Sequence, residues 1–233
     1  MKKFLIALTV LLGSVSLANA DKVNVGVTLM GGVFEVDGAS EIFSGDHSSN
    51  TTTTKVTKKA SDEDEAEGEF ALGSVFVEVN LTDQFGIGVN HVAHDIDSES
   101  SENIQNIGGT GIVTNRQAQS INTVSVKFSD LNTVYAIAKL NDNVYAKVGY
   151  VEVDVQTEEN LQTGGAYDDT SLDGYSLAVG YNYGMDNGAF VRVEASYMDL
   201  DGVSLTNKND STKSVSVDGI SGYGAGISIG KSF

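Results

Sequence analysis

Residues 175–184 read Y-S-L-A-V-G-Y-N-Y-G, and this stretch decides the fold. Large apolar or aromatic residues alternate with small or polar ones, as Tyr175, Leu177 and Val179 alternate with Ser176 and Ala178. A period of two sends the two kinds of side chain to opposite faces of a β-strand. The stretch therefore predicts a strand with one apolar face and one polar face.

Seven more stretches of the chain alternate in the same way. They are residues 23–30, 74–81, 85–90, 134–140, 144–150, 191–197 and 222–229. The connections between the eight stretches are alternately long and short. The long ones are Asp37–Gly68, Asp95–Asn122, Gln156–Gly174 and Asp199–Lys213, and the short ones are Thr82–Gln84, Asn141–Asn143 and Gly184–Gly188. An up-and-down antiparallel sheet with this rhythm has all its long loops at one end.

The rest of the composition decides what kind of sheet this is. Residues 21–233 contain no long apolar run, so a membrane span must be a closed β-barrel, because only helices and barrels satisfy every backbone group in lipid. The second face of the strands is small and polar, whereas a soluble barrel of the lipocalin type is apolar inside. We predict an all-β protein, an eight-stranded antiparallel up-and-down transmembrane β-barrel, closed by pairing of Val23–Val33 with Gly222–Phe233.

The apolar face carries aromatic residues at two levels, which is typical of membrane-interface girdles. Phe85, Tyr181, Tyr183 and Phe233 lie near the short turns, and Tyr150, Tyr175, Tyr197 and Tyr223 lie near the long loops. Between the two levels we expect an outward, mid-membrane set: Val77, Val148, Val179, Val193 and Ile227.

The N-terminus is typical of an export signal. Lys2 and Lys3 precede the short apolar run Phe4–Leu12, and Ala18-Asn19-Ala20 is a small-x-small cleavage site. This predicts a cleaved signal peptide over residues 1–20 and a barrel with four long external loops over residues 21–233. The alternative is a retained N-terminal anchor.

The chain contains no Cys, so disulfides and thiolate chemistry are excluded. The formal net charge is −18, and −20 once Lys2 and Lys3 are removed. Nucleic acid is therefore not an expected partner, because its binding needs clustered Lys and Arg.

The C-terminal residue supplies a resemblance. Phe233 ends a strand of alternating apolar residues, as in the assembly signal of bacterial outer-membrane proteins. Together with the signal peptide and the eight strands, it makes the chain resemble the small outer-membrane barrels: the OmpA transmembrane domain, OmpX and the opacity-protein-like porin family. The resemblance implies a place in the outer membrane of a Gram-negative bacterium, in contact with the lipid bilayer and lipopolysaccharide. It also implies insertion by the barrel-assembly machinery, with Phe233 as the C-terminal assembly signal.

Two features could suggest chemistry. His91 and His94 are three residues apart and fall on opposite faces of a strand, so shared metal ligation is not expected. The acidic run Asp62–Glu69 and the carboxylates after Asp95 could hold divalent cations, but they match no EF-hand pattern, and a solvated loop is the simpler interpretation. We expect no cofactor, no metal centre and no enzymatic activity.

The candidate site is the lumen. Glu78, Lys147, Arg192 and Glu194 fall at similar heights on the inward face, and Lys139 lies nearer the periplasmic mouth. An eight-stranded barrel is barely wider than its side chains, and unpaired buried charges are costly. We therefore predict that these charges pair and plug the barrel.

Two functions follow from this interpretation. The first is a surface barrel with a structural or adhesion role, in which the long acidic external loops bind an external macromolecule or divalent cations. The alternative is a narrow porin-like channel for ions or small solutes.

Overall fold

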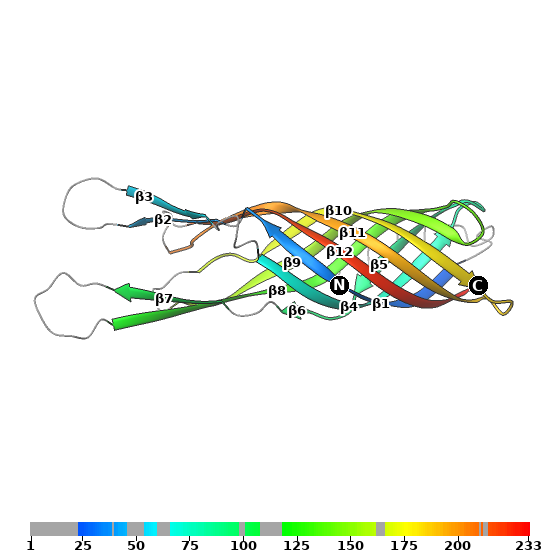
Figure 1. Ribbon diagram of the computed structural model, residues 1–233, viewed down its shortest axis with the longest axis horizontal. Helices are drawn as coiled ribbons and strands as arrows, with labels where there is room; N and C mark the ends of the chain where they lie inside the picture. Colours follow the sequence, from blue (N-terminus) through cyan, green and yellow to red (C-terminus); the bar gives the residue numbers. More distant parts are fainter. Residues whose placement is uncertain are drawn as a thin grey trace, which may run out of the picture.

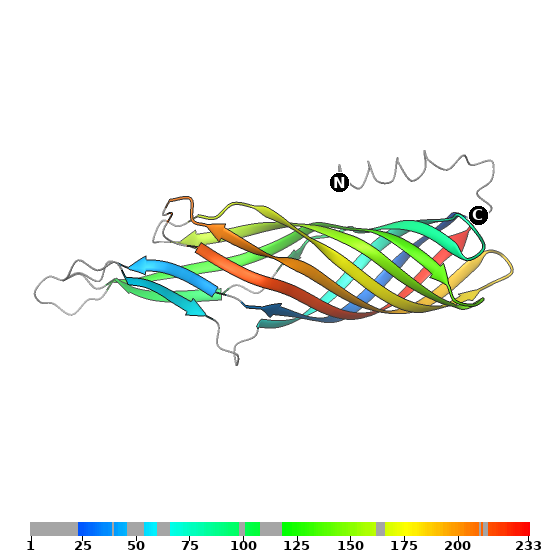
Figure 2. The ribbon, with the colours of Figure 1, turned by 90° about the horizontal axis from the view of Figure 1, so that it is seen from above.

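The computed structural model describes residues 23–38, 40–45, 54–59, 66–97, 101–107, 118–161, 166–209, 211 and 214–233. The expected signal peptide, residues 1–20, lies outside these residues. The described chain forms one antiparallel sheet that closes on itself (Figures 1 and 2). Its eight long strands are β1 (Val23–Asp37), β4 (Ala66–Asn80), β5 (Phe85–Val92), β8 (Ala118–Lys139), β9 (Val144–Leu161), β10 (Thr170–Gly184), β11 (Ala189–Thr206) and β12 (Ser214–Ser232). No helix of the described residues is long and apolar enough to span a membrane.

The predicted closure is confirmed. β12 pairs with β1 along its length, with Val27 opposite Ile229 and Val33 opposite Tyr223. At the end of the seam, Val23 and Phe233 exchange backbone hydrogen bonds of 3.2 and 2.9 Å. Closure leaves these strands without free edges, which is the condition for a sheet to stand in lipid.

The three predicted short turns are also present, and they lie at the end where β12 finishes (Figure 1). In the middle turn, Asn141 Oδ1 accepts hydrogen bonds from the backbone N–H groups of Asn143 and Val144, at 2.9 and 2.8 Å. The last turn contains Gly188 with φ +82°, a left-handed conformation that glycine adopts without strain.

The strands are longer at the opposite end than predicted. β9 and β10 occupy much of Gln156–Gly174, and β11 occupies much of Asp199–Lys213, both of which were expected to be loops. The first two long loops also contain strands: β2 (Ser40–Gly45), β3 (Thr54–Lys59), β6 (Ile96–Asp97) and β7 (Ser101–Ile107). The β2–β3 hairpin and the β7–β8 pair project beyond the barrel (Figure 2).

The prediction failed here because the apolar residues change along the strands from the outward face to the inward face. Near the turns the apolar residues point outward: Val148 is 55% exposed. Beyond Tyr150 they point inward, and Val151 and Val153 are buried while Glu152 faces out. Strands predicted from outward apolar residues therefore end too early, at the level where the apolar residues turn inward.

The inverted region has a core of its own inside the barrel. The buried residues are Val151, Val153, Val155, Leu172 and Leu200, and Val126, Phe128, Leu131, Met198, Val203 and Ile220 pack against them. We call these residues the outer apolar core. A β-bulge between Ser129 and Asn132, with Asp130 at φ 50°, shifts the alternation of β8 by one residue. This shift lets Phe128 and Leu131 both pack on the core.

Candidate functional site in the lumen

Four charged side chains point into the lumen. Side chains alternate between the two faces of a strand, and the residues next to these four point outward. Glu78 lies on β4, Lys147 on β9, and Arg192 and Glu194 on β11, where Val193 between them is 50% exposed. The structure brings these four predicted residues together across the lumen. We call them the charge cluster.

The centre of the charge cluster is the pair Glu78 and Arg192, whose side chains are 1% and 6% exposed. Both carboxylate oxygens of Glu78 accept hydrogen bonds from the guanidinium group, at 2.7 and 2.8 Å. Glu78 also accepts from Asn24 Nδ2 at 3.2 Å and from the Tyr135 hydroxyl at 2.9 Å. Arg192 Nε donates to Asn182 Oδ1 at 2.9 Å. A buried bidentate pair with these added partners is held in one geometry.

The second pair is Lys147 with Glu194, at 2.8 Å. Lys147 Nζ also lies 3.6 Å from Glu78, so it links the two carboxylates. The Tyr145 hydroxyl donates to Glu194 at 2.8 Å. Two acids and two bases therefore neutralise one another in a single network.

Aromatic rings surround the two cations. Lys147 Nζ lies 4.7 Å from the ring centre of Tyr135 and 5.3 Å from that of Tyr145. The guanidinium carbon of Arg192 lies 4.5 Å from the ring centre of Phe190, a range in which cations are attracted to ring faces. Phe190 also lies 6.3 Å from Phe76, so four aromatic rings stand around the two cations at this level.

Glycines on the neighbouring strands make room for these rings. A Cβ at Gly180 would stand 2.3 Å from the ring of Tyr145, and one at Gly88 would stand 2.5 Å from the ring of Tyr135. Both rings therefore occupy the space that a side chain on the neighbouring strand would need. The structure thus assigns a packing role to inward glycines that the sequence showed only as small residues.

Lys139 does not join the charge cluster. It is exposed at the turn end of β8 and makes no ion pair within the described residues. Conversely, Asn24, Tyr135, Tyr145 and Asn182 contact the charge cluster but were not predicted as site residues. Their signal was available, since each is a polar or aromatic residue in the inward phase of a strand.

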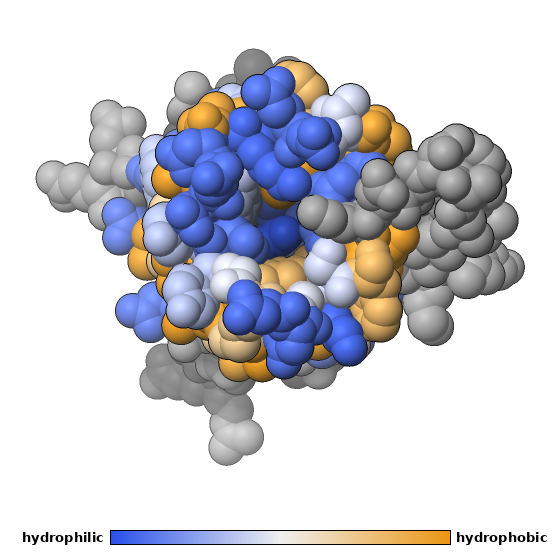
Figure 3. Space-filling model, turned by 90° about the vertical axis from the view of Figure 1, so that its right-hand side faces the viewer, coloured by the Kyte–Doolittle hydropathy of each residue, from blue (hydrophilic) through white to orange (hydrophobic). Residues whose placement is uncertain are grey.

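The mouth of the barrel at the turn end is hydrophilic and hollowed (Figure 3). Polar residues line the lumen above it: Asn24 and Thr28 are buried, and Thr28 Oγ1 is 2.8 Å from Ser228 Oγ. A polar interior behind an apolar outer wall is the reverse of a soluble protein.

The two histidines are held apart. His91 Nδ1 is 2.9 Å from Asn132 Oδ1, whereas His94 Nε2 accepts a hydrogen bond from the backbone N–H of Gly73 at 2.9 Å. Within the described part of the chain, no group of three His, Asp or Glu residues could hold a metal ion. The acidic run Asp62–Glu69 lies partly outside the described residues.

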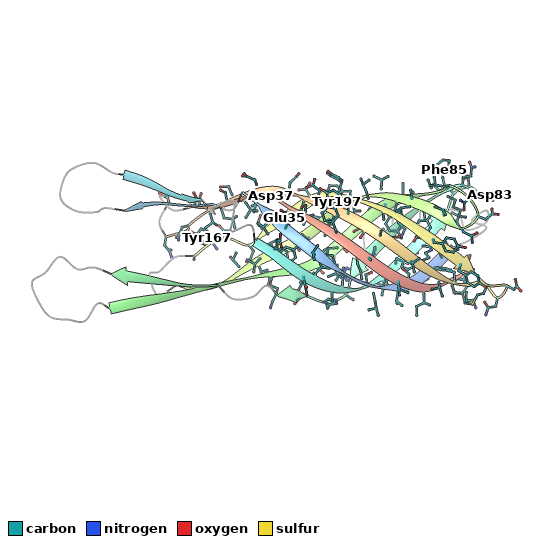
Figure 4. All side chains as sticks on the ribbon, in the orientation of Figure 1. Glu35, Asp37, Asp83, Phe85, Tyr167 and Tyr197 are labelled. Carbon is teal, nitrogen blue, oxygen red and sulfur yellow. The ribbon has the colours of Figure 1, made fainter. Side chains whose placement is uncertain are left out.

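A row of tyrosines on the outer wall marks where the surroundings change. The rings of Tyr175, Tyr197 and Tyr223 follow one another at 6.3 and 5.0 Å between centres. The hydroxyl groups of Tyr175 and Tyr197 donate to Asp199, at 2.7 and 3.2 Å. Figure 4 shows Tyr197 well along the barrel from Phe85, which lies at the turn end.

Carboxylates do not lie in hydrocarbon, so the bilayer ends at this row, and the apolar wall below it faces lipid. The protein is an outer-membrane β-barrel. The outer apolar core stands outside the bilayer, at the end of the barrel opposite the short turns.

Comparisons with solved structures find similar chains, among them two that are described as outer-membrane proteins. Ail, the attachment invasion locus protein of Yersinia pestis, is 10% identical, with 90% of this chain and 98% of Ail covered at a TM-score of 0.34. The outer membrane protease OmpT of Escherichia coli is 12% identical, with 92% and 97% covered at 0.41. OprG of Pseudomonas aeruginosa is 12% identical, with 89% and 95% covered at 0.45. No family model and no curated protein matches the sequence.

Proposed function

We propose that this protein is a non-conducting surface barrel, whose external strands and acidic loops bind a partner outside the cell. The observation that carries the proposal is the charge cluster. Glu78, Lys147 and Arg192 come from three strands, β4, β9 and β11, and meet in the middle of the lumen. A path for ions through this level would have to break buried ion pairs, which is costly.

The outer apolar core supports the same proposal. It lies along the lumen on the external side of the charge cluster, where its side chains come from β8 to β12. A hydrated ion would have to pass an apolar region after it had passed the charged one. The lumen therefore opposes ions by two different mechanisms in series.

The external surface is the part of the molecule available for binding. Outside the tyrosine row the outward face carries carboxylates: Glu35, Asp37, Glu67, Glu69, Glu152, Asp154, Asp173, Asp199 and Asp201. Glu35 and Asp37 lie in this zone of Figure 4. Such a surface favours a cationic partner, including divalent cations that bridge it to the phosphates of lipopolysaccharide.

Export and assembly belong to the same proposal. Residues 1–20 act as the cleaved signal peptide and residues 21–233 form the mature barrel. Phe233 is the assembly signal that the barrel-assembly machinery reads. N-terminal sequencing of the protein from outer membranes should begin at Asp21, and a start at Met1 would contradict cleavage.

The decisive experiment is conductance in a planar bilayer. The wild-type protein should show little or no steady conductance. Glu78→Ala should raise the open probability, whereas Lys139→Ala should not, because Lys139 lies outside the charge cluster. A large and stable wild-type conductance, unaffected by Glu78→Ala, would refute the proposal and favour the second candidate, a narrow porin. The observation that favours a porin is the hydrophilic, hollowed mouth of the barrel at the turn end (Figure 3).

A further inference from the structure

A cavity of about 100 Å³ lies in the lumen between the charge cluster and the outer apolar core. Its floor includes Lys147 and Glu194 of the charge cluster together with Tyr135. Its lining also includes Leu131 and Met198, which pack on the outer apolar core. The cavity is therefore bounded by a charged layer on one side and an apolar layer on the other.

The walls of the cavity are amphipathic. The apolar lining includes Met30, Phe70, Leu72 and Val92, and the hydroxyl groups come from Ser74, Thr133, Ser176 and Ser196. Apolar walls with a few polar groups are typical of sites for small molecules.

Asn90 provides the polar atom that most needs a ligand. It lines the cavity, and its Oδ1 is buried without a hydrogen-bond partner in the described structure. Buried carbonyl oxygens nearly always have a donor, and an unsatisfied one is costly. A molecule in the cavity that donates a hydrogen bond would satisfy this atom.

The charge cluster decides the charge of that molecule. Glu78 and Glu194 are already neutralised by Arg192 and Lys147. A charged ligand would leave one uncompensated charge in a buried site, so an uncharged ligand is favoured.

We propose that this cavity binds a small uncharged molecule that donates a hydrogen bond to Asn90 Oδ1 and packs its apolar end against Met30 and Leu72. An engineered cavity of about 150 Å³ holds benzene, so this cavity suits a molecule of about four or five non-hydrogen atoms. The ligand class is that of short-chain alcohols and primary amides.

On the external side of the cavity, the pairing between two strands of the barrel wall stops short. β4 pairs with β5 only over Ser74–Asn80, although β4 extends to Ala66. Phe70 and Leu72, which line the cavity, belong to the part of β4 beyond this pairing. The last links there are the backbone bond from Ala93 to Gly73 and the bond from Gly73 to the exposed His94 ring, at 3.3 and 2.9 Å.

The test is a titration followed by nuclear magnetic resonance, with the isotope-labelled protein in lipid nanodiscs. The probes are 1-propanol and its isomer ethyl methyl ether, which has the same size but no hydrogen-bond donor. 1-Propanol should shift the signals of Asn90, Ser74 and Thr133 saturably, and it should bind about 5- to 10-fold more tightly than the ether, as expected for one hydrogen bond. The lipid-facing Ile227 reports simple partitioning into the bilayer.

Two variants make the result specific. Asn90→Leu removes the acceptor and fills the cavity, and Ser196→Val fills it while keeping the acceptor, in case the first variant does not assemble. Both should abolish saturable shifts, whereas Ala195→Leu on the lipid face should not. Equal binding of alcohol and ether, shifts only at Ile227, or a cavity that exchanges water alone would overturn the proposal. None of these outcomes depends on whether the barrel conducts or the loops bind a partner.

Discussion

The guanidinium group of Arg192 faces the Glu78 carboxylate, and its two terminal nitrogens donate to the two oxygens at 2.7 and 2.8 Å. The residues are 114 positions apart in the chain and stand on β4 and β11, which are not neighbours in the sheet. Their contact therefore crosses the interior of the barrel. A bond across the axis ties opposite walls together, so it bears on both stability and permeation.

Glu78→Ala should destabilise the barrel strongly. The substitution leaves Arg192 buried without its carboxylate, which costs about 3–5 kcal/mol in comparable buried pairs. Urea unfolding in phospholipid vesicles measures the free energy directly. Lys139→Ala is the matched control, since Lys139 is exposed and should change stability by less than about 0.5 kcal/mol. Similar losses for both variants would show that the charge cluster does not hold the barrel together.

The loss of stability caused by an arginine on the outer wall should depend on its depth in the bilayer. Val193 and Asp201 lie on the same face of β11, on opposite sides of the Tyr197 row. Val193→Arg should cost roughly 2–4 kcal/mol, whereas Asp201→Arg, in water, should cost about 0–1 kcal/mol. Vesicle unfolding experiments test both. Equal costs would mean that the bilayer does not end at the tyrosines.

A cysteine cross-link can test the register of the closing seam. The chain has no Cys, and Leu29 lies directly opposite Ile227. The double variant Leu29→Cys with Ile227→Cys should form a disulfide in the oxidising periplasm, visible as altered migration of the boiled, unreduced protein. Pairing Leu29→Cys with Ile229→Cys should give much less cross-linking. The opposite preference would indicate a seam shifted by two residues.

Trypsin added to intact cells should cut β3 and leave the barrel assembled. β3 contains Lys55, Lys58 and Lys59 and pairs only with β2 among the described strands, and a two-stranded hairpin is marginally stable in water. Unheated samples should migrate on a denaturing gel as the folded barrel, and boiled samples should split into two fragments. Replacing the three lysines with Gln should abolish the split. An uncut wild-type protein would indicate that the hairpin is protected.

Much of the membrane-embedded half could be predicted from the sequence because two solvents act on it in a regular way. Lipid outside and polar groups inside give a period of two, so the alternation of Val148, Val179 and Val193 predicted both the strands and their orientation. The charge cluster followed from the same parity. The hydrogen-bond partners of the charge cluster could not be predicted in this way. Alternation tells which face a residue lies on, but the stagger of the strands decides which residues meet across the lumen.

The external half was predicted poorly for a physical reason. There the outer face is acidic and the inner face is apolar, as Glu152 and Val153 show. The strands of the other half were predicted from apolar residues on the outer face, and this arrangement is reversed here. The bulge at Asp130 adds a second change of phase within β8. The bulge segment Ser129–Asn132 contains neither glycine nor proline, so no turn-forming residue marks this change of phase in the sequence.

Between Tyr150 and Val151 the apolar side chains change from the outer to the inner face, and this change also fixes the depth of the protein in its membrane. If the barrel sank by two residues, Glu152 would enter hydrocarbon; if it rose by two, Val148 would enter water. On β10 the tyrosines at 175 and 183 stand eight residues apart, which is roughly 20 Å along the membrane normal for a strand tilted by about 40°. The height of the apolar outer wall therefore matches a thin bilayer, and a thicker bilayer would have to thin around the protein.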